Sequence, residues 1–102
     1  MKISYRRTGG FAGMVIAFDL DTDTLSIEES EILQDLVSTA DFFALPTRMT
    51  SSEPGADHFQ YRIMVETEER QHTVEVGESA VSENLSPLLN ELKSLSRSMR
   101  GS

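Results

Sequence analysis

Two stretches of this chain alternate polar and apolar residues, and that pattern constrains the fold more than any other feature. Alternation with a period of two is typical of strands that bury one face and expose the other. It runs through residues 2–8 and 14–20, and again through residues 58–79 around a charged turn at residues 68–69. Each stretch therefore predicts an antiparallel hairpin with one apolar face.

The positions of the turns predict the register of both hairpins. A glycine-rich turn over residues 9–12 and a four-residue turn around residues 68–69 bring the apolar positions of each hairpin onto one face. The pairs expected from these turns are Tyr5–Ile16, Ile3–Phe18, Ile63–Val74 and Tyr61–Val76.

Each hairpin is followed by apolar residues at helical spacing. Ser26, with Glu29 three residues later, forms a capping box that predicts a helix over residues 27–40. Ser86 as a cap and Pro87 at the first helical position predict a second helix towards the end of the chain. The expected apolar stripes are Ile32, Leu33, Leu36, Val37 and Ala40 in the first helix, and Leu85, Leu88, Leu89, Leu92, Leu95 and Met99 in the second.

These elements predict a single α+β domain over residues 1–102 in the order strand, strand, helix, strand, strand, helix. One apolar face per hairpin and one apolar stripe per helix favour a four-stranded antiparallel or mixed sheet with both helices packed on one face. We expect the other face to meet water, residues 46–57 to form an irregular loop, and residues 97–102 to fray.

Charge and composition exclude some classes of partner. The formal net charge is -8 and the basic residues do not gather in one run, which argues against binding to nucleic acid. The segment MKISYRRTGG lacks the apolar run of a signal peptide, and no stretch is long enough to cross a membrane. We therefore expect the protein in the cytoplasm, with export by another route left open. As a separate expectation, the protein is a monomer.

Residues that could perform catalysis or hold a cofactor do not come together in the sequence. There is no cysteine, and alternation puts the two histidines, His58 and His72, on opposite faces, with His72 inward and opposite Val65. Such histidines are more often packed or solvated than catalytic. Arg6 and Arg7 beside the glycines are only a weak signal for an anion. We expect no enzymatic activity, no cofactor and no metal site.

Two exposed segments are the candidates for binding a partner protein. The turn over residues 9–13 carries Phe11 at its tip, where the neighbouring glycines cannot shield the ring. Phe11 either anchors the chain in a partner pocket or folds back over the hairpin. Loops as long as residues 46–57 are often functional. The candidate partner-binding residues are Gly9, Gly10, Phe11, Ala12, Gly13, Arg48, Met49, Glu53 and Asp57.

The segments ISYRRTGGFAGM, ADHFQYRI and LSPLLNEL occur in this order and carry a resemblance to a known family. They resemble emfourin, the protein inhibitor of protealysin and related bacterial thermolysin-like metalloproteases. The matching motifs are residues 6–13, 57–61 and 86–92. The resemblance implies a small α+β protein that binds the active-site region of a zinc metalloprotease, with the zinc belonging to the protease. For such an inhibitor, a hydrophobic anchor such as Phe11 could enter a specificity pocket, and Glu53 or Asp57 could approach the metal. The loop over residues 46–57 is nominated by its expected exposure and not by the resemblance.

Two other functions stay open at this point. The acidic charge is compatible with a regulatory module that binds a basic partner, which strong salt dependence would reveal. A small enzyme or ligand-binding protein would need a pocket on the solvated sheet face, lined by Arg62, Gln60 and Glu75.

Overall fold

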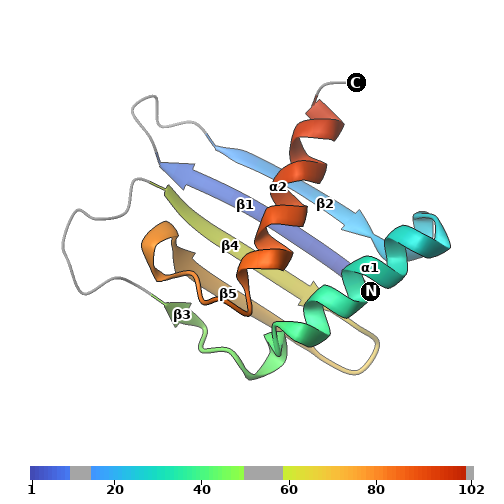
Figure 1. Ribbon diagram of the computed structural model, residues 1–102, viewed down its shortest axis with the longest axis horizontal. Helices are drawn as coiled ribbons and strands as arrows, with labels where there is room; N and C mark the ends of the chain where they lie inside the picture. Colours follow the sequence, from blue (N-terminus) through green and yellow to red (C-terminus); the bar gives the residue numbers. More distant parts are fainter. Residues whose placement is uncertain (10–14, 50–58, 101–102) are drawn as a thin grey trace.

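A mixed sheet and two helices form two layers in the computed structural model, which describes residues 1–9, 15–49 and 59–100, with side chains as far as Arg97 (Figure 1). The α+β class predicted from the sequence is confirmed. The strands are β1 (Lys2–Gly9), β2 (Ile16–Asp21), β3 (Arg48–Met49), β4 (Phe59–Glu66) and β5 (Gln71–Gly77), and the helices are α1 (Ile27–Thr39) and α2 (Ser86–Arg100).

The described part of the sheet has five strands, in the order β2-β1-β4-β5-β3, so the prediction of four strands was wrong. The additional strand, β3, runs parallel to β5 and pairs Arg48 with Glu75 and Met49 with Val76. It begins inside the segment that was predicted to be an irregular loop. Two residues are too few to show an alternation, so the sequence pattern could not reveal this strand.

The register of the second hairpin was predicted correctly, and that of the first was wrong by two residues. β4 and β5 pair Ile63 with Val74, as expected. In the first hairpin, Tyr5 lies opposite Phe18 and Ile3 lies opposite Leu20. The connection between β1 and β2 is therefore longer than the turn that was assumed. A shift by two residues keeps every side chain on its predicted face, because the side-chain period of a strand is two.

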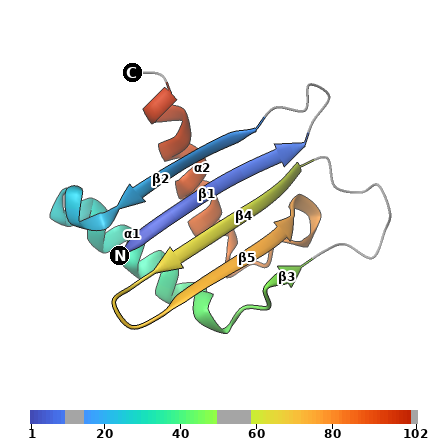
Figure 2. The same cartoon turned by 180° about the vertical axis from the view of Figure 1, so that it is seen from behind.

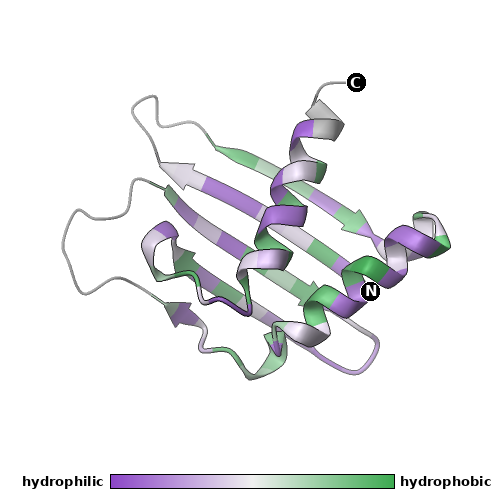
Figure 3. Ribbon diagram, viewed as in Figure 1, coloured by the Kyte–Doolittle hydropathy of each residue, from purple (hydrophilic) through white to green (hydrophobic). Residues whose placement is uncertain are grey.

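Both helices cover one face of the sheet, as predicted, and none of the described residues forms a helix over the other face (Figures 1 and 2). Apolar and polar residues alternate along β4 and β5 accordingly (Figure 3). The buried core lies between the sheet and the helices. It consists of Ile3, Tyr5, Leu33, Val37, Ala40, Phe42, Tyr61, Ile63, Val65, Val74, Val76, Leu85, Leu88, Leu89 and Leu92.

The helices follow their predicted signals with two corrections. Ser86 was predicted to cap the second helix, but it is the first residue of α2, so that start was wrong by one residue. The hydroxyl of Ser26 accepts a hydrogen bond of 3.2 Å from the backbone N–H of Glu29, as the capping box requires. Ile32 was predicted to join the apolar stripe of α1, but half of its surface is exposed, while its neighbour Leu33 is buried. α1 lies towards one end of the sheet, so a narrower stripe than the sequence suggests reaches the core (Figure 1). The fraying of residues 97–102 stays a prediction.

No helix in the described ranges is long and apolar enough to cross a membrane.

Candidate functional site

The strand ends that border the two segments nominated for partner binding lie at the same end of the sheet. β1, β3 and β5 end there, and β2 and β4 begin there, because β1, β3 and β5 run in the same direction. We call this the loop end and define it by Gly9, Ile16, Met49, Phe59 and Gly77. The ends of β1 and β4 project beyond both helices at this point (Figure 1). Strand pairing thus brings together borders that are far apart in the sequence.

The strand that leads to the first nominated segment is held firmly in the sheet. β1 has β2 on one side and β4 on the other, and its Tyr5 is buried between Phe18 and Tyr61, with ring centroids 5.4 and 6.2 Å away. Burial raises the pKa of Tyr5, with a smaller contribution from Tyr61, so the phenol stays neutral. This ring is part of the support of the loop end.

Two details of the loop end depend on particular residue types. Gly9 has a φ of 110°, a value that glycine adopts readily and other residues avoid. It lies opposite Phe59, whose ring is covered by the guanidinium of Arg7 at 4.7 Å. Arg7 therefore packs on the helix side of the sheet.

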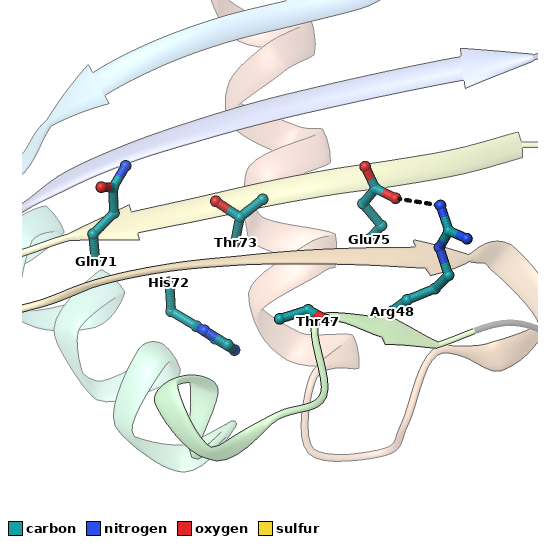
Figure 4. Close-up of a pocket in the computed structure, with 6 residues that line it drawn as sticks. All are labelled: Thr47, Arg48, Gln71, His72, Thr73 and Glu75. Carbon is teal, nitrogen blue, oxygen red and sulfur yellow. Dashed lines mark hydrogen bonds and ion pairs between the residues drawn. The ribbon is translucent and has the colours of Figure 1, made fainter.

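On the open face, four charged side chains form a row across the sheet just inside the loop end. Arg6 lies opposite Arg62, Arg62 opposite Glu75, and Glu75 opposite Arg48. We call these four residues the arginine row. Glu75 accepts hydrogen bonds from Nε of Arg62 at 2.9 Å and from Nη2 of Arg48 at 3.3 Å, and Nη2 of Arg62 also donates to it. Figure 4 shows the Arg48–Glu75 pair bridging β3 and β5.

His72 has a structural role on the opposite side of β5. It lies opposite Val65 on the inward face, as predicted, and points away from Gln71 (Figure 4). Its Nε2 donates a hydrogen bond of 2.7 Å to the carbonyl oxygen of Leu45, and its ring packs edge-to-face with that of Phe42, with the ring centroids 5.7 Å apart. The residue therefore ties the segment before β3 to the sheet. His58 lies outside the described residues.

The open face has a hollow at the place where a ligand-binding function would need one. The hollow measures about 290 Å³, and its lining includes Gln60, Arg62 and Glu75. Hydrogen bonds from Arg62, and then Arg48, lower the pKa of Glu75, which makes this carboxylate a weak base. In the described ranges, no three His, Asp or Glu side chains are grouped so that they could hold a metal ion.

Comparison with known protein families identifies the chain. A family model described as Emfourin matches residues 5–93, from β1 into α2. The chain belongs to the Emfourin family. This is a family of protease-inhibitor domains, which agrees with a binding function and a protease as the general class of partner. Comparison with curated proteins and with solved structures found no match.

The structure places three of the nine candidate residues of this Emfourin domain. Gly9 ends β1 at the loop end, and Arg48 and Met49 form β3, where Met49 is partly buried against the core and Arg48 is exposed. The described borders of both nominated segments thus lie at one end of the sheet. The other candidates lie outside the described residues, and their role stays a prediction: Gly10, Phe11, Ala12, Gly13, Glu53 and Asp57.

Sequence reasoning did not find the arginine row as a unit. Arg6 was noted only as a weak anion signal, and Arg62 and Glu75 only as residues of a conditional pocket. Their proximity depends on the pairing of β1 with β4, which joins the two hairpins. An alternation pattern gives the face of each residue but does not say which strands are neighbours.

Glu75→Gln is expected to lower stability at neutral pH and to have little effect in acid. The pKa of Glu75 is lower in the folded protein than the ordinary value of 4.5. A carboxyl group of this kind stabilises the fold above its unfolded pKa, and the contribution is lost as the pH falls through the folded pKa. The difference in urea midpoint between wild type and Glu75→Gln should therefore disappear as the pH falls through the folded pKa of Glu75. An equal, pH-dependent gap for Glu69→Gln, in the exposed turn after β4, would contradict this explanation.

Proposed function

We propose that this protein inhibits thermolysin-like zinc metalloproteases by binding at the active-site cleft through its loop end. The observation that carries the proposal is the family match over residues 5–93, which spans both hairpins and the strand leading into the glycine-rich turn. The resemblance of residues 6–13, 57–61 and 86–92 to emfourin supports the narrower class of target protease.

The geometry of the loop end suits a stoichiometric inhibitor. Such an inhibitor needs a contact surface that is ordered before binding, because ordering it on binding would cost affinity. β1 is paired on both sides and the side chain of its Tyr5 is buried, so the strand that leads into the turn has little freedom. The inhibitor contributes contacts, and the catalytic zinc is that of the protease.

A titration tests this proposal. A thermolysin-like protease at fixed concentration is mixed with increasing amounts of this protein, and hydrolysis of a peptide substrate is followed. We expect activity to fall linearly to an end point at one inhibitor per protease, as tight one-to-one binding requires. Full activity with several proteases of this type would overturn the proposal and favour a regulatory module with another partner.

Competition with a small active-site ligand tests the binding mode. A ligand that occupies the catalytic zinc is expected to slow the onset of inhibition in proportion to its occupancy of the site. If the rate of inhibition does not depend on this ligand, the contact lies outside the cleft. The proposal that the protein is an inhibitor would still stand.

A further inference from the structure

The arginine row has a net positive charge, because its single carboxylate cannot neutralise all of its guanidinium groups. The row contains three guanidinium groups and one carboxylate, that of Glu75, which binds Arg62 and Arg48. Arg6 takes part in none of the ion pairs found within residues 1–9, 15–49 and 59–97. It lies directly opposite Arg62, and like charges in such a cross-strand pair are unfavourable.

The overall composition of the protein does not account for this row, because the whole chain is strongly acidic. At the far end of the same face the charge is reversed. There Lys2 is flanked by Asp21 on β2 and Glu66 on β4, and Asp19 follows on the same face of β2. The open face is therefore positive beside the loop end and negative away from it. Between the row and the loop end lie the uncharged side chains of Thr8 and Gln60.

We propose that the arginine row is a docking surface for a carboxylate-rich patch on the target protease, beside the cleft that the loop end enters. This inference rests on the proposed function and adds the chemistry of a second contact. A guanidinium matches a carboxylate with two parallel hydrogen bonds, and Arg6 has this capacity unused in the described structure. Glu75 holds Arg62 and Arg48 in place, so the surface is largely ordered before binding.

A phosphate backbone fits this surface less well. Nucleic-acid binding requires several basic groups that track successive phosphates. The row is a short line across the strands, with the carboxylate of Glu75 within it and acidic residues further along the same face. A compact acidic patch on a folded protein is the better complement.

The test compares two charge reversals on one strand. Arg6→Glu and Lys2→Glu each change the net charge by the same amount, on the same face of β1, at opposite ends of the face. Arg6→Glu places a carboxylate opposite Arg62, so stability is expected to be equal to or above that of wild type. The measurements are the urea midpoint and the inhibition constant against a thermolysin-like protease, at low and at high NaCl concentration.

We expect Arg6→Glu to weaken inhibition about tenfold at low salt, and Lys2→Glu to change it by less than about twofold. The difference is expected to narrow at high salt, since exposed charges are then screened. If the two variants change the inhibition constant equally, or if Arg6→Glu does not change it, the docking surface is overturned. Inhibition by the wild type would still support the proposed function in that case. Loss of oligonucleotide binding by Arg6→Glu, with inhibition unchanged, would assign the row to phosphate and also overturn it. Absence of inhibition by wild type would overturn both proposals.

Discussion

Phe11→Ala is expected to weaken inhibition of a thermolysin-like protease about 100-fold, which corresponds to about 2.8 kcal/mol of binding free energy. Aromatic anchors that fill a partner pocket are typical of the few residues that dominate an interface. Phe11 follows the border of β1 at the loop end, where Gly9 already has a backbone conformation suited to glycine. The inhibition constant and the urea midpoint are measured on the same preparation.

The matched control for Phe11→Ala is Ile27→Ala. Ile27 is 79% exposed at the start of α1, away from the loop end, so truncating it removes an apolar side chain without touching the proposed contact (Figure 1). We expect this variant to inhibit like wild type. If Phe11→Ala lost stability in step with its loss of inhibition, the ring would brace the hairpin instead of anchoring the partner.

Leu33→Ala is expected to lower the free energy of unfolding by about 3 kcal/mol, within the range for fully buried leucines. Leu33 is 1% exposed and lies in the core between α1 and the sheet. For a domain of this size the loss corresponds to a fall in melting temperature of about 10–20 °C. Small domains have only about 5–15 kcal/mol of stability, so this single change removes a large share of it. Thermal and urea denaturation followed by circular dichroism measure the effect.

The neighbouring residue provides the control for Leu33→Ala. Ile32 has nearly the same volume, but it is 50% exposed. Ile32→Ala is expected to cost less than about 1 kcal/mol, because less apolar surface leaves water on folding and alanine favours the helix. A loss as large as that of Leu33→Ala would mean that Ile32 is packed in solution, as its place in the apolar stripe first suggested.

The second hairpin shows what local sequence patterns can predict. Its register, with Ile63 opposite Val74, follows from two alternating runs and a short charged turn. The backbone N–H of Thr67 donates to the carbonyl oxygen of Arg70 at 2.8 Å, which closes this turn. Where the turn is short and the runs are regular, few other pairings bury both apolar faces.

The first hairpin and β3 show where the same reasoning fails. Glycines permit connections of several lengths, and any register shifted by two residues keeps the apolar side chains on one face. The sequence therefore could not fix the partner of Tyr5. β3 exists because Arg48 and Met49 lie beside the edge of β5, and nothing in their own pattern predicts it. Gly9, Arg48 and Met49 were named from the sequence, and the structure places them at or beside the loop end, but the strand that contains two of them was not predicted.

The sequence by itself determined the two hairpins, the two helices and the face of each hairpin strand on which a side chain lies, because the periods of two and 3.6 residues are local properties of the chain. It also indicated the family, through short motifs in a fixed order. The tertiary structure alone decided how the two hairpins join, so that β1 pairs with β4 and Arg6 comes to lie opposite Arg62. Backbone hydrogen bonds between strands are alike in every pair, so the order of strands is chosen by the packing of the whole core and helices.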